Sequence, residues 1–412
     1  MSAPARDIGR EIGMGRMIVW LVVLAALAGP GLAQRRNDPE NCPYCKNDPA
    51  LMEAAGIVSH GGFAFGKSGS DTASVDRLLA TSDIRWIESK HFELGIALGT
   101  YKIKQDEVNK IRAEMERLAV ALPSVPKKPK SLDPWLRAHL YAQRLEDIWN
   151  RFLELMQIQE KDFPDGSAPW NMQGKYMGEG PYVGQKGKYE VLILPSEASC
   201  VTYLKDQFGL LVKMTQRWNQ VDLDTISVTI HTQQGQLNDD QGLHGHVAFN
   251  MTVNLLDGYK HYSYETPVWI REGLAHFVER ELNPKYNTFD SSEGAVADMT
   301  RKENWQPEVR KLILKGEAPR MAELIALRDY SELRLPHHYT SWSMTEYMIE
   351  TNPAGYACLN DGLHGITNAK GIPDGSNLPD VHRDKFKECF GMSYPEFDAA
   401  WAAWVMATYS SQ

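Results

Sequence analysis

Two pairs of residues between positions 246 and 279 have types and spacings suited to a metal site. His246 and Asn250 are four residues apart, and so are Glu272 and His276. Residues at this spacing share one face of a helix, so each pair can direct its side chains to one point. Zinc-dependent hydrolysis uses such a layout: an H-E-x-x-H helix supplies two imidazoles and a glutamate base, and a later helix supplies a third ligand.

Two positions of this layout hold residues that cannot do the expected work. Val247 stands where the general base belongs and cannot take a proton from water. General-base catalysis typically contributes roughly 10²–10⁴-fold to a rate. Asn250 stands where the second imidazole belongs, and its amide oxygen is a poorer zinc ligand than imidazole. One imidazole, His246, and one carboxylate, Glu272, remain in place.

Hydrophobic periodicity indicates the elements that must position these residues, and it predicts an α+β fold. Alternating apolar residues predict strands at 86–95, 189–194 and 226–231. A short sheet is expected beside a helical C-terminal half, preceded by a mainly helical N-terminal region. The expected helices cover residues 105–122, 133–158, 242–257, 266–282, 305–315, 337–350, 353–362, 378–388 and 394–406.

These elements together resemble the gluzincin metallopeptidases, most closely the peptidase-MA-like group. The segment Pro267-Val-Trp-Ile-Arg-Glu-Gly-Leu-Ala-His-Phe-Val-Glu279 is similar to the W-x-x-E-G-x-A segment that follows H-E-x-x-H in that family. The stretches 339–347 and 390–401 resemble later parts of the same domain. The likeness extends over roughly residues 187 to 406, with a degenerate motif at His246-Val-Ala-Phe-Asn250.

The resemblance implies roles for individual residues. His246 would be the first zinc ligand and Glu272 the third, while Asn250 marks the lost second-ligand position. His276 falls where the family often keeps an acidic residue that supports the ligands. Tyr339 or His338 would be the donor that stabilises the transition state opposite the base.

Three interpretations follow. The first is an inactive pseudo-peptidase that holds no metal, with a cleft that binds a peptide or protein or serves as a scaffold. The second is a zinc-dependent metallohydrolase with a rebuilt site of His246, Glu272 and His276, with His244 or His261 nearby. In the third the resemblance misleads, and these are ordinary core or surface residues. Apart from these interpretations, the pair His337–His338 follows Pro336 at a helix start and is expected to be exposed or to cap the helix.

The N-terminus predicts export. Arg10 and Arg16 precede the apolar run 17–28, and small residues follow up to Ala33, as in a cleaved signal peptide at 1–33. No other run is apolar and long enough to cross a bilayer, so no stable membrane insertion is expected after cleavage. The formal net charge of −9 argues against a nucleic-acid partner. The remaining chain divides into an extended cysteine-containing lead-in at 34–80, a mainly helical region at 81–185, and the gluzincin-like domain at 186–412.

The chain has five cysteines, and an exported protein would be expected to use some of them in disulfides. Cys358 and Cys389 both lie in the helical C-terminal region and form the first expected pair. Cys42-Pro-Tyr-Cys45 has the spacing of a redox motif, but no strand precedes it to supply a redox fold. A small local disulfide is expected there instead.

Overall fold

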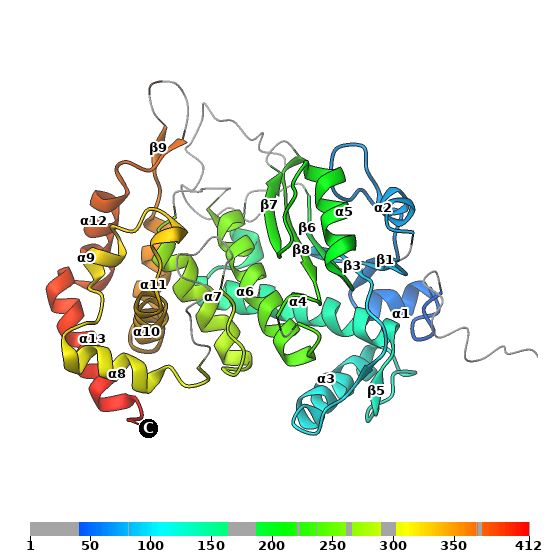
Figure 1. The fold of residues 1–412 in the computed structure, drawn as a ribbon, viewed down its shortest axis with the longest axis horizontal. Helices are drawn as coiled ribbons and strands as arrows, with labels where there is room; N and C mark the ends of the chain where they lie inside the picture. Colours follow the sequence, from blue (N-terminus) through cyan, green and yellow to red (C-terminus); the bar gives the residue numbers. More distant parts are fainter. Residues whose placement is uncertain are drawn as a thin grey trace, which may run out of the picture.

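The computed structural model describes residues 41–80, 82–163, 187–220, 223–235, 237–260, 266–289, 302–367, 369 and 373–411. The fold is α+β, as the sequence predicts, with one main sheet, two small two-stranded sheets and many helices (Figure 1). The signal peptide predicted at 1–33 lies outside the described residues, and so does His261.

Six strands form the main sheet in the order β1-β2-β3-β6-β8-β7. The central strands β3, β6 and β8 are parallel, and the remaining pairs are antiparallel. Two additional two-stranded ladders pair β4 with β5 and β9 with β10. The strands are β1 (Ile57–Ser59), β2 (Arg85–Ser89), β3 (Phe92–Ile96), β4 (Tyr101–Lys102), β5 (Ser131–Leu132), β6 (Tyr189–Leu194), β7 (Gln216–Gln220), β8 (Thr225–His231), β9 (Ile366–Thr367) and β10 (Pro373–Asp374).

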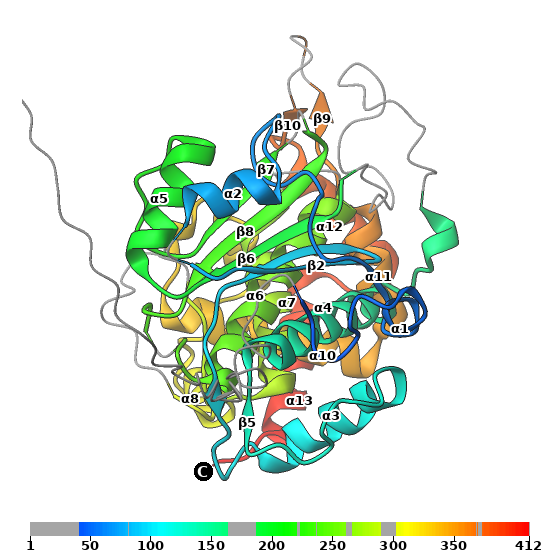
Figure 2. The ribbon, with the colours of Figure 1, turned by 90° about the vertical axis from the view of Figure 1, so that its right-hand side faces the viewer.

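Helices cover both faces of the sheet (Figure 2). Because successive side chains on a strand point to opposite faces, Leu192 and Leu194 join a small core under α2 and α5, while Val191 and Ile193 join the main core. That main core lies under α4 and α6. These helices are α2 (Thr72–Leu78), α4 (Pro134–Met156), α5 (Glu197–Phe208) and α6 (Asp240–Tyr259).

The C-terminal half is helical, and its helix α7 joins it to α6. Helix α7 packs against both α6 and α10, and α8, α11 and α13 also contact α10. Asp133, Ser196 and Asp239 cap the N-termini of α4, α5 and α6 by accepting backbone N–H bonds. The remaining helices are α1 (Pro49–Ala54), α3 (Val108–Ala121), α7 (Val268–Leu282), α8 (Gln306–Lys315), α9 (Met321–Leu324), α10 (Leu335–Thr351), α11 (Pro353–Gly362), α12 (Leu378–Phe390) and α13 (Tyr394–Thr408).

The predicted division near residue 186 falls inside one continuous sheet. Strand β3, from the region predicted as 81–185, pairs in parallel with β6, from the predicted gluzincin-like domain. The lead-in predicted as extended also contributes β1 and α2. The N-terminal region is therefore part of the same α+β layer structure as the candidate site. Among the described residues, no helix has the length and hydropathy needed to cross a membrane.

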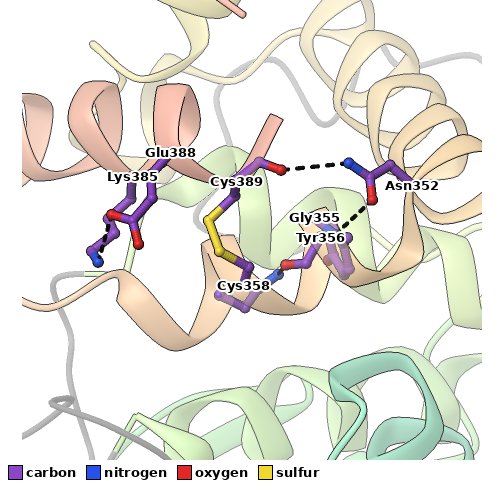
Figure 3. The surroundings of a disulfide bond; sticks show 8 residues. Asn352, Gly355, Tyr356, Cys358, Lys385, Glu388 and Cys389 are labelled. Atoms are coloured by element: carbon purple, nitrogen blue, oxygen red, sulfur yellow. Dashed lines mark hydrogen bonds and ion pairs between the residues drawn. A yellow bond between two sulfur atoms is a disulfide. The ribbon is translucent and has the colours of Figure 1, made fainter. Parts of the chain in front are cut away.

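The cysteines confirm one expectation and correct another. Cys358 of α11 and Cys389 of α12 form the predicted disulfide, with their Cα atoms 5.8 Å apart (Figure 3). The local disulfide expected between Cys42 and Cys45 is wrong, because both thiols are free and buried. Cys200 is also free and buried.

The disulfide between Cys358 and Cys389 is expected to stabilise the C-terminal helices, because it closes a loop of 31 residues in the unfolded chain. Replacing both cysteines with serine should lower the free energy of unfolding by about 2–4 kcal/mol. Urea denaturation measures this change. A reducing agent should give a similar loss in the wild-type protein and little further loss in the double variant; equal sensitivity in both would contradict the assignment.

Glu190 is a buried carboxyl group in the middle of the sheet. Its oxygens accept bonds from the Gly66 amide at 2.9 Å and from Nε2 of Gln220 at 3.1 Å. Burial raises the pKa of Glu190 to about 8, and the neighbouring carboxylate of Glu93 contributes in the same direction. The folded protein therefore retains a proton that the unfolded chain loses near pH 4.5.

This difference predicts how stability depends on pH. A carboxyl group with a raised folded-state pKa makes stability fall as pH rises from about 4.5 to about 8, and no further loss is expected above that range. Glu190→Gln should reduce the fall and make the protein more stable than wild type at pH 9. Free energies of unfolding at pH 5, 7 and 9 test this, with Glu53→Gln on the exposed part of α1 as the control. Unchanged pH dependence in the Glu190 variant would count against it.

Candidate metal centre

One face of α7 carries three ionisable side chains in succession. Glu272, His276 and Glu279 stand at positions i, i+4 and i+7, which lie above one another on a helix. None of the three is more than 1% exposed, because α7 lies between α6 and α10. Buried groups of this kind are tolerated only where they have polar or metal partners, so the partners decide what the face can do.

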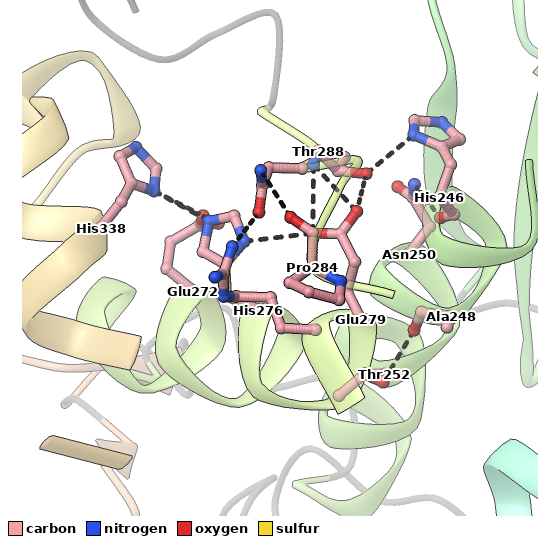
Figure 4. A network of polar contacts seen from close by, with 12 residues as sticks. His246, Ala248, Asn250, Thr252, Glu272, His276, Glu279, Pro284, Thr288 and His338 are labelled. Atoms are coloured by element: carbon pink, nitrogen blue, oxygen red, sulfur yellow. Dashed lines mark hydrogen bonds and ion pairs between the residues drawn. The ribbon is translucent and has the colours of Figure 1, made fainter. Parts of the chain in front are cut away.

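His338, in the first turn of α10, points at this face and completes a cluster (Figure 4). Its Nδ1 lies 3.1 Å from Nε2 of His276 and 3.3 Å from Oε2 of Glu272. The remaining side of the triangle, from Nε2 of His276 to Oε2 of Glu272, is 3.5 Å long. Two imidazole nitrogens and one carboxylate oxygen therefore converge on one point, and all three residues are fully buried.

Gly273 allows α10 to approach α7 this closely. A Cβ atom at this position would lie 2.7 Å from the carbonyl oxygen of Ser341, and Oγ1 of Thr345 would be closer still. Only a residue without a side chain fits against the α10 backbone here. The glycine beside Glu272 thus sets the helix spacing that brings His338 to the cluster.

The Glu272 carboxylate is ionised and incompletely satisfied. Burial raises its pKa, but the contacts with His276 and then His338 prevail and lower the pKa of Glu272 to about 2. Neither of its oxygens accepts a hydrogen bond of ordinary geometry in the described part of the chain. A buried anion whose nearest neighbours are two imidazole nitrogens is well suited to a shared cation.

Glu279 holds His276 from the opposite side of the ring. Its Oε2 lies 3.3 Å from Nδ1 of His276, and its Oε1 accepts the Thr288 amide at 2.9 Å and the Thr288 hydroxyl at 2.6 Å. If Nδ1–H is donated to this carboxylate when a cation binds, Nε2 of His276 would offer its lone pair at the point where it faces His338 and Glu272. Metal-binding histidines are commonly oriented by a carboxylate in this way.

Aromatic rings enclose the cluster. The rings of Phe249 and Trp305 have their centroids 5.0 and 4.8 Å from that of His276, and Phe289 lies 5.0 Å from His338. An apolar enclosure keeps the local dielectric low and strengthens the attraction between a cation and Glu272.

His246, predicted as the first zinc ligand, lies outside this cluster. Its Nε2 is 2.7 Å from Oγ1 of Thr215, and its Nδ1 is 3.1 Å from Oγ1 of Thr288. It is linked to the cluster through Thr288 and Glu279, as Figure 4 shows. His246 and Glu279 also line a small cavity of about 40 Å³ beside Phe289.

The other positions of the degenerate motif serve the packing of α6. Val247 is fully buried in the main core. Asn250 accepts a bond from Nη1 of Arg217 at 2.8 Å and donates Nδ2–H to the His246 carbonyl at 2.8 Å. Asn250, at the position predicted for a second imidazole, therefore ties α6 to the edge strand β7.

Tyr339, His337 and His338 are neighbours in the sequence, but the structure gives each a different environment. Tyr339 is buried against Trp305, with ring centroids 4.9 Å apart, and burial raises its pKa to about 12. His337 accepts the Arg334 amide at 3.0 Å, which confirms the capping role expected at this helix start. His338 does not share that role, because it is fully buried and faces Glu272.

The structure thus revises the predicted ligand set. It brings together Glu272 and His276 and replaces His246 by His338, which the sequence presents only as a capping or donor residue. The spacing Glu272-x-x-x-His276-x-x-Glu279 is a signal that the sequence contains, since all three share one helix face. Nothing local in the sequence indicates that α10 delivers the third donor.

Comparisons with known proteins give no match, either to protein-family models or to curated proteins. The gluzincin resemblance therefore stays a prediction, and the chemistry of the site rests on its own geometry.

Gly273→Ala is predicted to separate α7 from α10, because the added methyl group meets backbone atoms of Ser341. Overpacking of this kind should cost on the order of 1–3 kcal/mol of stability and should weaken any metal bound by His338. Thermal unfolding with and without added zinc measures both effects.

Gly245→Ala in α6 is the matched control. Its added Cβ would lie 3.5 Å from Cγ of Glu279, an ordinary contact, and alanine favours a helix by about 1 kcal/mol over glycine. This variant should be at least as stable as wild type. Equal tolerance of both substitutions would show that the close approach at Gly273 does not hold the cluster together.

Proposed function

We propose that this protein binds zinc through Glu272, His276 and His338, in a gluzincin-like fold whose original peptidase site has been lost. The observation that supports the proposal is the triangle of donor atoms, with sides of 3.1, 3.3 and 3.5 Å. Zinc bonds of 2.0–2.2 Å in tetrahedral geometry separate nitrogen and oxygen donors by about 3.3–3.6 Å. The three side chains are therefore already spaced almost as a bound ion requires.

The donor set suits zinc chemically. Two imidazoles and one carboxylate form a common ligand set of zinc sites with three protein ligands. The carboxylate brings one negative charge, and Glu279 adds a second behind His276, so the buried charge of a divalent cation would be balanced. The polar chain from Glu279 through Thr288 to His246 would keep His276 in the required orientation.

The proposal treats the protein as a metal-binding pseudo-peptidase, not as a conventional peptidase. Val247 has no proton-accepting atom, and Glu279 already accepts bonds from Thr288 and contacts His276. Neither residue is placed to supply the general-base step of the H-E-x-x-H mechanism. We also propose that the protein is exported and that a cleft in it binds a peptide or protein.

A hydrolase with a rebuilt site is the second candidate. One observation favours it: three protein donors leave one position of a tetrahedral ion open, as in catalytic zinc sites. Zinc-dependent cleavage of a peptide library that disappears in the His276→Ala variant would establish this alternative.

The proposal predicts that full-length protein loses one equivalent of zinc when His276 or His338 is replaced by alanine. Removing a ligand should weaken binding more than the roughly 10–100-fold expected for Glu279→Gln, which only disturbs the orientation of His276. Elemental analysis gives the stoichiometry, and competition with a chromophoric chelator gives the affinities.

His337→Ala is the control, because it removes the neighbouring imidazole on the same turn without touching the cluster. It should retain full zinc binding. If the alanine variants of His276 and His338 are too unstable to purify, zinc should still raise the melting temperature of Glu279→Gln less than that of wild type. Wild-type zinc content after substitution of both His276 and His338 would refute the proposal.

A further inference from the structure

Four side chains from residues 42 to 139 form a second cluster, remote in sequence from α7. Cys42 and Cys45 occupy a turn before α1, His60 follows β1, and His139 lies in α4. Cys42, Cys45 and His139 are at most 2% exposed. Neither thiol is used in a disulfide, so the function of this arrangement is open.

The turn of Cys42-Pro-Tyr-Cys45 presents its sulfur atoms to one point. The backbone amides of Tyr44 and Cys45 each lie 3.4 Å from Sγ of Cys42. The chain then reverses through Lys46 and Asn47, both in the left-handed region with φ of 56° and 54°. Lys46 also donates its amide to the Cys42 carbonyl at 3.0 Å. Amide donors around a sulfur stabilise its thiolate form, which is the form that binds metals.

Two imidazoles meet these sulfur atoms. Nε2 of His139 lies 2.9 Å from Sγ of Cys42, and Nε2 of His60 lies 3.1 Å from Sγ of Cys45. The donor atoms of Cys42, Cys45 and His139 all fall within 4.8 Å of one another. Nδ1 of His60 lies 3.1 Å from the Trp86 carbonyl, so it donates its proton there and leaves Nε2 free to act as a ligand.

We propose that Cys42, Cys45, His60 and His139 bind a structural zinc ion. Two cysteines and two histidines form a closed tetrahedral ligand set, which is typical of structural zinc sites. Zinc–sulfur bonds of 2.3 Å and zinc–nitrogen bonds of 2.0–2.1 Å separate neighbouring S and N donors by about 3.5–3.6 Å. To admit the ion, the sulfur–nitrogen contacts of 2.9 and 3.1 Å must widen by roughly half an ångström. His60, which contacts Cys45 but lies outside the group of donors within 4.8 Å of one another, must also move closer to the other donors.

The surroundings favour a structural metal over a redox dithiol. Reactive cysteine pairs are partly exposed, whereas both of these sulfur atoms are buried and each contacts a histidine. The site would join a turn, the end of β1 and the long helix α4. Zinc here would hold the N-terminal segment against α4, independently of the proposed centre at Glu272.

The two sites can be distinguished with cobalt, because only thiolate ligands give intense sulfur-to-cobalt charge-transfer absorption in the near ultraviolet. Full-length wild-type protein reconstituted with Co²⁺ should show this absorption, and Cys42→Ser/Cys45→Ser should lose it. Zinc content should fall from about two equivalents to one in this variant. His276→Ala should lose the other equivalent and keep the charge-transfer band.

Cys200→Ser is the matched control, since it removes a buried free thiol elsewhere and should change neither zinc content nor spectrum. If the double serine variant does not fold, His60→Cys keeps the test open, because a third thiolate should preserve zinc and strengthen the band. Co²⁺-loaded wild-type protein without the band would overturn the proposal. A reversible Cys42–Cys45 disulfide in freshly purified protein would also overturn it and would identify a redox pair instead.

Discussion

The candidate centre depends on one constraint: Glu272 is a fully buried carboxylate, and burial of an unbalanced charge is costly. His276 and His338 approach this carboxylate from two different helices, and Glu279 contacts the far side of the His276 ring. Gly273 sets the helix separation at which all these contacts can form. In this half of the protein, the packing of α7 against α10 therefore determines whether the candidate ligands can meet.

The two candidate zinc sites differ in the kind of chain segments they connect. The Glu272 cluster joins two helices that already pack against each other, so a metal there adds charge balance more than new connectivity. The cluster at Cys42 joins residues 97 positions apart, from Cys42 to His139. Closing so long a loop removes more entropy from the unfolded chain, as a disulfide does.

Much of the fold follows from hydrophobic periodicity, but the ligand sets do not. The stripes of α4, α6 and α7 and the apolar runs of β6 and β8 predict these elements with bounds close to those observed. His338 could not be assigned from its neighbours, because a histidine after a helix-start proline is equally suited to capping, as His337 shows. The free thiols of Cys42 and Cys45 were missed for a similar reason: His60 and His139 meet them only after the chain has folded.

The parallel centre of the sheet has a consequence for how the protein is made. Strand β3 pairs with β6 through partners Phe92 and Tyr189, and β6 pairs in turn with β8. On a ribosome, the N-terminal strands therefore emerge long before the strand that must cover their edge. Such long-range pairings form slowly, and an open strand edge invites pairing with other chains. During that interval a metal-bound turn at Cys42 would anchor the N-terminal segment to α4 before the sheet is complete.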